Sequence, residues 1–289
     1  MERRRQDNVP GRSTPRVRPN PRTFIGDLPR GLVPRIESGG ADIRTMRRFG
    51  EFPWIMIDIT YASSLAARGV TAQKFYPEGR VVTTSTIHDD ALLSFDFDRE
   101  LRVVSKFGPA CHVPCDRPVY LEDSPAGRAG LIDDCVRSTI EMAEELRASS
   151  VRILPLIKGV NQSEWSRCAE PLRRAGFIDY ACYVRQFFGH GTGRRAREMV
   201  EHIRGIIATC DPRYVILIGF QSPKHQADFP PAVRAFAGQR WRRVTVGTDS
   251  TGRTLRRSLR SLLASSNRAG KRRQSVLHET PLAPEIQEA

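Results

Sequence analysis

The sequence lacks any apolar run close to the roughly 20 residues that a membrane-spanning helix needs, so we expect no membrane partner. Its N-terminal stretch also lacks the apolar segment of a secretory signal peptide, which favours a cytoplasmic protein. No second Cys or His pair follows Cys111 and Cys115 at a zinc spacing, and we therefore expect no metal site. The cysteines are scattered through segments that read as core, as reduced buried thiols would be, at positions 111, 115, 135, 168, 182 and 210.

Acidic residues are in short supply as well, with 32 Asp and Glu against 46 Lys and Arg and a net charge of +14. A positive field of this size attracts polyanions such as nucleic acid. Arg-rich chains are also common in high-GC genomes, so charge alone does not establish that partner. With 289 residues and 39% hydrophobic residues, the chain suits one α/β barrel or two ordinary globular domains.

Both ends of the chain offer little apolar surface to bury. Residues 1–23 combine Arg, Pro and polar side chains, and residues 267–289 carry a basic cluster at 271–273. We expect both tails to be disordered, and we predict a single domain over residues 24–266.

Short apolar or β-branched runs recur through that domain. Their continuous apolarity indicates strands that are covered on both faces, as in a parallel sheet. Helical patterns at 126–148, 161–176 and 191–210 separate the later runs, which makes repeated βαβ units. We therefore predict an α/β fold, a (β/α)8 TIM-type barrel that is irregular in its first third. The predicted strands are 54–60, 80–87, 110–115, 151–157, 178–184, 213–219 and 242–248, with an eighth in TFIGDLP or GLVPRI.

Polar residues or glycines end several of these runs, namely Asp116, Lys158 with Gly159, Gly219, and Asp249. In a barrel, reactive groups cluster at the carboxyl ends of the strands. Taken in order, these strand ends resemble those of the tRNA-guanine transglycosylase superfamily, barrels that exchange a guanine base for a 7-deazaguanine. The resemblance covers about residues 80–262 and is carried by KFGPACHVPCDRP, LPLIKGVNQSEWSRCAEPLRRAGFIDYACYV, DPRYVILIGFQSP and VTVGTDSTGRT.

The sequence departs from that family at several points. The family's Asp-Ser-Gly-Gly-Phe motif is missing from its usual place, because Glu37-Ser-Gly-Gly40 lies too early and His88-Asp89-Asp90 stands nearest to the expected position. Lys158 replaces the family's Gln, and Tyr183-Val184 replaces a Gly pair. The zinc cluster of the tRNA enzymes is absent, and no RNA-binding domain follows residue 262. In these departures the chain resembles the DNA-acting branch, the DNA 7-deazaguanine transglycosylases of phages and bacterial modification islands.

The resemblance implies roles for three carboxylates. Asp249 would be the nucleophile that attacks the sugar carbon C1′, although an Asp in this position also suits a helix N-cap. Asp116 would accept hydrogen bonds from the N1–H and exocyclic amine of a guanine-like base, and the alternatives are an ion pair with Arg117 or a turn cap. Asp89 would be the general base or acid, with His88 beside it.

Other residues would bind the substrate. Lys158 and Gly159 would contact the base or its substituent, with a phosphate as the alternative partner of Lys158, and Gly219 would allow close approach of the backbone. A basic segment next to Asp249 would hold nucleic acid, since no acidic residue interrupts the chain from 253 to 273, and the alternative is a solvated helix face. The basic residues of this segment are Arg253, Arg256, Arg257 and Arg260.

We therefore expect a pentosyltransferase that replaces guanine in DNA with a 7-deazaguanine, such as 7-cyano-7-deazaguanine, through a covalent Asp-linked intermediate. Its partners would be DNA and the free 7-deazaguanine base, and it would need no cofactor. If a phage encodes it, it would act in the host cytoplasm, in anti-restriction. The alternatives are a tRNA-guanine transglycosylase and a catalytically inactive barrel that binds nucleic acid. The sequence leaves open the inserted base, the target sequence and the oligomeric state, for which a homodimer is one candidate.

Overall fold

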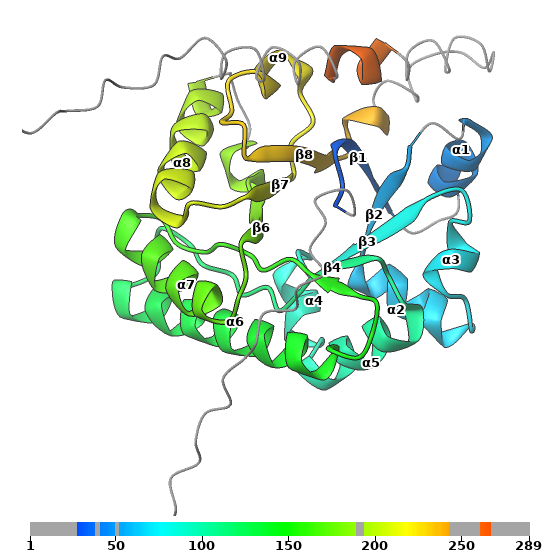
Figure 1. Ribbon diagram of the computed structural model, residues 1–289, viewed down its shortest axis with the longest axis horizontal. Helices are drawn as coiled ribbons and strands as arrows, with labels where there is room; N and C mark the ends of the chain where they lie inside the picture. The colour runs from blue at the N-terminus through cyan, green and yellow to red at the C-terminus, as the bar shows by residue number, and fades with distance from the viewer. Residues whose placement is uncertain (1–27, 38–40, 50–51, 189–193, 243–260, 267–289) are drawn as a thin grey trace, which may run out of the picture.

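The computed structural model describes residues 28–37, 41–49, 52–188, 194–242 and 261–266. Within these residues, eight strands form one parallel sheet in the order β5-β4-β3-β2-β1-β8-β7-β6 (Figure 1). The strands are β1 (Gly31–Ile36), β2 (Trp54–Asp58), β3 (Arg80–Thr84), β4 (Cys111–Val113), β5 (Arg152–Ile153), β6 (Asp179–Tyr183), β7 (Tyr214–Ile218) and β8 (Val233–Gly238).

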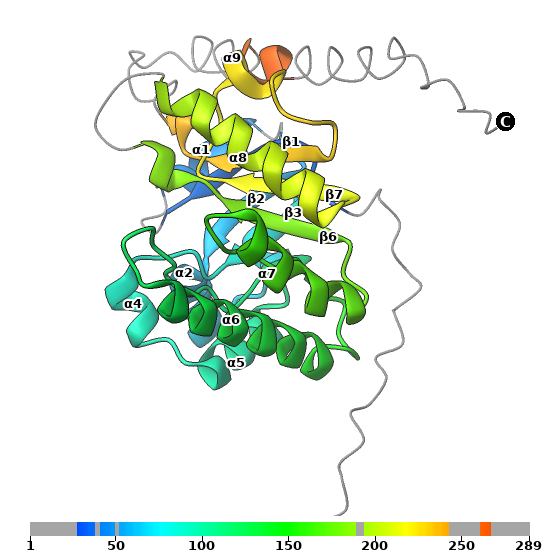
Figure 2. The same cartoon turned by 90° about the vertical axis from the view of Figure 1, so that its left-hand side faces the viewer.

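Helices alternate with these strands, and α2, α5, α6, α7 and α8 contact one another in that order around the sheet (Figures 1 and 2). Asp58, Ser124 and Asn161 cap the N-termini of α2, α6 and α7, because their side chains accept backbone N–H groups that the first turn leaves unpaired. The helices are α1 (Ala41–Phe49), α2 (Ile59–Ala67), α3 (Ala72–Phe75), α4 (Asp89–Leu93), α5 (Phe97–Phe107), α6 (Pro125–Glu145), α7 (Gln162–Arg174), the 3-10 helix η2 (Arg185–Phe188), α8 (Arg194–Cys210) and α9 (Pro223–Gln226).

The sheet curls until its two end strands, β5 and β6, approach each other. In the described part of the chain these two strands share no continuous ladder, and a single parallel bridge joins Leu156 to Ala181 just beyond β5. The Ile157 N–H donates to the Ala181 carbonyl at 3.0 Å, and the Ala181 N–H donates to the Pro155 carbonyl at 2.8 Å. The predicted α/β class with a parallel sheet is confirmed, whereas the ladder of named strands is not closed into a complete barrel.

Neighbouring residues along the strands belong to two different apolar clusters. Leu32 and Ile55 pack in the larger cluster between sheet and helices, while Val33, Met56 and Val82 pack in a second cluster on the other face. Successive side chains of a strand point to opposite faces, so a strand that is buried on both faces must be apolar at every position. The continuous apolar runs of the sequence have this cause.

The last described strand along the chain, β8, was not predicted. The run GLVPRI forms the strand β1, as predicted. The predicted strand 242–248 is wrong at its start, because Arg242 belongs to a helical turn, and residues 243–248 lie outside the described residues. The strand in its place is β8, which pairs with both β7 and β1. Its inward positions Ala235 and Ala237 are small, so its sequence has little of the β-branched character that marks the other strands.

Each of the six cysteines is buried and free, as expected for reduced thiols. Burial raises the pKa of Cys135 and of Cys168 to about 12, because a thiolate is poorly solvated in the core. These thiols therefore act as small core side chains at neutral pH.

Candidate functional site

The carboxyl ends of the parallel strands lie along one edge of the sheet, which we call the carboxyl edge. Asp58 ends β2 and Thr84 ends β3, while Asp116 and Lys158 follow β4 and β5. Helix α4, which follows β3, stands at the same edge (Figure 2). Side chains from four neighbouring strands thus converge there.

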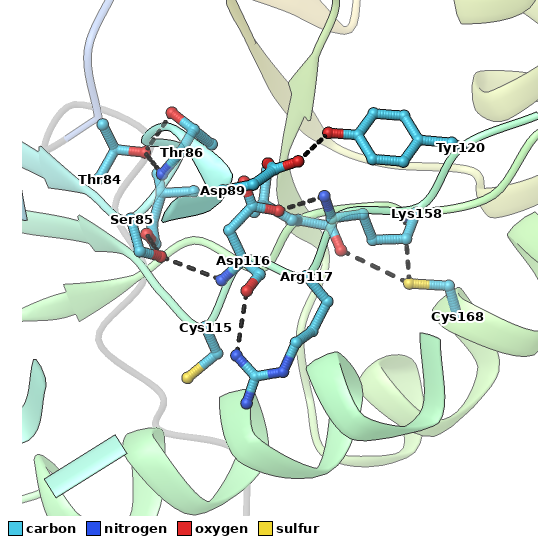
Figure 3. A network of polar contacts seen from close by, with 12 residues as sticks. Thr84, Ser85, Thr86, Asp89, Cys115, Asp116, Arg117, Tyr120, Lys158 and Cys168 are labelled. Atoms are coloured by element: carbon cyan, nitrogen blue, oxygen red, sulfur yellow. Dashed lines mark hydrogen bonds and ion pairs between the residues drawn. The ribbon is translucent and has the colours of Figure 1, made fainter. Parts of the chain in front are cut away.

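Asp116 is fixed by its contacts with the end of β3. It follows Cys115, whose φ of 55° is left-handed, and its side chain is buried. The Asp116 N–H donates to Ser85 Oγ at 3.1 Å, and that hydroxyl donates to the Val113 carbonyl at 3.1 Å. The turn after β4 is thereby pinned to β3, and the Asp116 carboxylate points toward Lys158 (Figure 3).

Lys158 and Asp116 form a buried ion pair that joins the ends of β5 and β4. Their side chains are only 11% and 8% exposed, so little water screens the pair. Burial, the largest single influence, acts to lower the pKa of Lys158. The charge and hydrogen bond of Asp116, together with Cys135 and Cys168, raise it, and the pKa lies above its ordinary value. The ammonium group therefore stays charged at neutral pH, with N–H donors to spare beyond its contact with Asp116.

Arg117 is not the ion-pair partner of Asp116 that the sequence suggested. Its guanidinium donates to the Asp116 backbone carbonyl at 3.0 Å and lies 3.8 Å from the Asp134 carboxylate. The turn residue beside Asp116 thus supports the backbone, while a lysine from the loop after β5 engages the carboxylate.

A buried polar chain lies behind the Asp116 turn. Glu100 of α5 accepts a hydrogen bond from the Cys115 N–H at 3.1 Å, and its same oxygen lies 2.9 Å from His112 Nε2. The other ring nitrogen of His112 lies 2.8 Å from Thr83 Oγ1. Because these three residues are at most 4% exposed, they are inaccessible to substrate, and they hold the left-handed residue that precedes Asp116.

A second buried ion pair connects the loops that carry Asp116 and Lys158. Arg128 Nε donates to Glu164 Oε1 at 2.9 Å, and its Nη1 donates to the Leu121 and Asp123 carbonyls. Glu164 Oε2 accepts the Val160 N–H at 2.8 Å. The loops after β4 and β5 are therefore tied together below the Asp116–Lys158 pair.

Asp89 stands at the first turn of α4, exposed to solvent, with His88 before it as the N-cap residue. Its carboxylate accepts a hydrogen bond from the Tyr120 hydroxyl at 2.5 Å (Figure 3). This bond, together with burial, raises the pKa of Tyr120 to about 12, and the nearby Asp116 adds to the shift. The structure thus brings Asp89 near the Asp116–Lys158 pair, and the Tyr120 ring lies with them.

The backbone conformation explains why the two predicted site positions Gly159 and Gly219 are glycines. Gly159 has φ of 118°, and a Cβ there would stand 2.6 Å from the Glu164 Cβ. Gly219 has φ of 100°, and its Cβ would stand 3.1 Å from Arg185 atoms. Both positions need glycine for the fold, so their identity requires no ligand.

Asp58 is a carboxylate at this edge that the sequence reasoning passed over. It stands in register with Thr84 of β3, is half-buried, and accepts hydrogen bonds from the Tyr61 N–H and the Thr60 hydroxyl. The sequence does indicate Asp58 as a strand-end carboxylate, because the apolar run WIMI is followed by an acid, as the run before Asp116 is.

Asp249 and the four arginines of the basic segment, Arg253, Arg256, Arg257 and Arg260, lie outside the described residues. The strand predicted directly before Asp249 is not the eighth strand of the sheet, which ends at Gly238. Asp249 therefore follows β8 at a distance along the chain, and its place at the carboxyl edge stays a prediction.

A scan against models of protein families matches none of them to this chain, and a search of curated proteins also finds no match. Among the residues that the structure describes, no three His, Cys, Asp or Glu side chains gather as metal ligands would. None of the described helices combines the length and apolarity that crossing a membrane requires. The arrangement of Asp116, Lys158 and their neighbours is thus the basis on which a function is proposed.

Proposed function

We propose that the protein is a base-exchange transglycosylase that replaces guanine in DNA with a 7-deazaguanine such as 7-cyano-7-deazaguanine. The observation that carries the proposal is the buried Asp116–Lys158 pair at the carboxyl edge. A guanine base presents two N–H donors, at N1 and the exocyclic amine, beside the acceptor O6. Asp116 suits the donors and Lys158 suits O6, so the pair matches that edge of the base.

Such a pair supports selection as well as binding. A base that lacked the two donors would leave a buried carboxylate short of hydrogen bonds, which costs more than the bonds themselves contribute. Adenine carries an amine where guanine carries O6, and this amine would face the Lys158 ammonium group. We therefore expect strong preference for guanine and its 7-deaza analogues over adenine.

The proposal includes a TIM-type barrel as the complete fold. The strand order, in which β1 pairs with both β2 and β8, supports it, as does the Leu156–Ala181 bridge between the end strands. Active sites of such barrels lie at the carboxyl ends of their strands, where Asp116 and Lys158 stand.

The chemistry requires two bond exchanges at one sugar carbon. A carboxylate attacks C1′, the C1′–N9 bond breaks, and guanine leaves with its N9 protonated by a neighbouring acid. N9–H of the incoming base then loses its proton, N9 attacks C1′, and the carboxylate is released. Asp249 is the proposed nucleophile by resemblance, and Asp89 the proposed acid or base; Asp58 is a further carboxylate placed at the same edge.

Release of labelled guanine tests the reaction directly. We would incubate the protein with 8-¹⁴C-guanine-labelled DNA and unlabelled 7-cyano-7-deazaguanine, and analyse the nucleosides of the product by mass spectrometry. Expected are guanine release and 7-deazaguanine in the DNA, with neither in Asp249→Asn. Activity of Asp249→Asn, together with its loss in Asp58→Asn, would move the nucleophile to Asp58.

A parallel incubation with tRNA separates the nearest alternative. Incorporation into tRNA and not DNA would identify a tRNA base exchanger. Binding of nucleic acid without guanine release, and without a covalent adduct in denaturing gels, would favour the inactive nucleic-acid-binding barrel.

A further inference from the structure

The carboxyl edge is charged unequally along its length. The loops after β3 and β4 carry exposed or partly exposed acids, which we call the acidic rim: Asp89, Asp90, Glu122 and Asp123. The segments after β6, β7 and β8 carry exposed bases, which we call the basic rim: Arg185, Arg195, Arg197, Lys224 and Arg240.

The basic rim belongs to one side of the molecule because its strands are neighbours. β6, β7 and β8 are adjacent in the sheet, and η2, the start of α8 and α9 follow their carboxyl ends. Figure 2 shows α9 at the top and α8 below it, in front of the strands, both on the side away from α5 and α6. The rim residues therefore border the carboxyl edge opposite the acidic rim.

These bases have little acidic compensation. In the described residues, none of the five rim bases forms an ion pair with a carboxylate, and Arg240 donates to the Ser222 hydroxyl at 3.2 Å. The acids that border the rim include Glu198 and Asp228, and Asp228 lies 3.1 Å from His225. Beside Arg240, Glu37 and Asp42 also lie close, but both are paired with Arg242. A net positive surface remains, as a phosphate backbone requires.

We propose that a nucleic-acid strand runs along the basic rim, with its phosphates against Arg185, Arg195, Arg197, Lys224 and Arg240. This inference rests on the proposed function for the path of the target base. β4 and β8 stand four places apart in the curled eight-stranded sheet, and Val113 of β4 belongs to the same buried cluster as Ala235 and Ala237 of β8. A base whose N1 edge meets Asp116 after β4 directs N9, and the sugar-phosphate attached there, toward β8 and the rim. Asp89, which lies on the Asp116 side, would then exchange a proton with N9 through a bridging water.

The acidic rim fixes the same orientation from the other side. Phosphates placed over Asp89, Asp90 and Glu122 would be repelled by these exposed carboxylates. The strand therefore has one favourable side on which to lie, and the target nucleotide reaches across the edge after leaving its stack.

A pair of matched double variants tests the surface. Arg195→Ser with Arg197→Ser removes two charges from the rim, and Arg147→Ser with Arg174→Ser removes two exposed charges near the amino ends of β5 and β6. Both variants have the same net charge and retain the basic segment at 253–260. Dissociation constants for one 20-mer, as single strand and as duplex, would be measured between about 50 and 200 mM NaCl.

The expected result is a difference in salt dependence. For the rim variant, the slope of log K against log salt should become shallower by about two with the duplex, and binding should weaken at every salt concentration. The control variant should retain the wild-type slope. Equal slopes in the two variants, or a wild-type slope in the rim variant, would overturn the proposal.

A charge-removing variant of the acidic rim completes the test. Asp90→Asn with Glu122→Gln should bind DNA at least as tightly as the wild type, and weaker binding would contradict the orientation. Because these assays use binding alone, their outcome is independent of base exchange. If the rim variant binds DNA more weakly while the wild-type protein releases no guanine, the nucleic-acid surface stands and the transglycosylase proposal is rejected.

Discussion

The Asp116 carboxylate forms an ion pair with Lys158 in the folded chain. In the proposed function it also accepts hydrogen bonds from a base. Removing one partner of a buried pair leaves the other charge without compensation, which costs about 3–5 kcal/mol. We expect Asp116→Asn and Lys158→Met each to lower the free energy of unfolding by about 3 kcal/mol. The double variant should recover most of this loss in urea titrations, yet select guanine no better than either single variant. Wild-type stability of Asp116→Asn would show that the pair does not form in solution.

The pH dependence of this pair follows from the sign of the lysine shift. The folded-state pKa of Lys158 lies above the ordinary value of 10.5, so the folded state holds its proton more tightly than the unfolded state. The stabilising contribution is fully present below about pH 10.5 and is lost as pH rises through the folded-state pKa. Acidification to pH 6 should therefore leave the lysine contribution unchanged.

Glu100 affects the site through the backbone, since its carboxylate holds the Cys115 N–H and reaches no substrate. We expect Glu100→Ala to lower kcat/KM for guanine exchange at least tenfold, because the Asp116 turn loses its support. Val104→Ala on the same buried helix is the matched control, since it destabilises the core without contacting the turn. Glu100→Gln should restore much of the activity, because its amide oxygen still accepts the Cys115 N–H. Equal losses of kcat/KM in Glu100→Ala and Val104→Ala would show that Glu100 acts only as a core residue.

At the scale of the element, β2 to β7 were predictable from the sequence and β8 was not. A strand that is buried on both faces can be recognised in the sequence by its continuous apolar residues, as in YVILI of β7. β8 has Ala at its inward positions and Arg234 within it, so a more β-branched run at 242–248 appeared the better candidate. Asp116 and Lys158 were predictable as strand-end residues, but their pairing was not, because it joins loops 42 residues apart.

The end strands of the sheet give an element-scale prediction. If the Leu156–Ala181 bridge persists in solution, the amides of Ala181 and Ile157 stay hydrogen-bonded. We expect their hydrogen exchange to be slowed to within about tenfold of that of Ile216 in β7, which is paired on both sides, as in a closed barrel. Exchange at these amides as fast as in an unstructured peptide, with Ile216 still protected, would indicate an open sheet.

At the scale of the whole molecule, the buried thiols link stability to alkaline pH. Burial raises the pKa of Cys135 and Cys168 to about 12 and that of Cys210 to about 11, and it also raises the pKa of Cys182. In the unfolded chain these thiols ionise near 9.0, so above that pH the unfolded state releases protons that the folded state keeps. The free energy of unfolding must therefore fall as pH rises above about 9.

Urea titrations at pH 7 and pH 10 measure this loss, which should be about 1 kcal/mol for each buried thiol. The burial of phenols such as Tyr76, with a pKa of about 12, adds to the loss only above about pH 10. Cys182→Ala is the control: it destabilises the core at pH 7 by leaving a small cavity, but it should lose about 1 kcal/mol less than the wild type between the two pH values. A thiol reagent such as DTNB should leave the native protein unmodified at pH 7 and label all six cysteines in urea, since each thiol is buried. Rapid labelling of the native protein, or equal stability at pH 7 and pH 10, would contradict a core in which these thiols stay protonated.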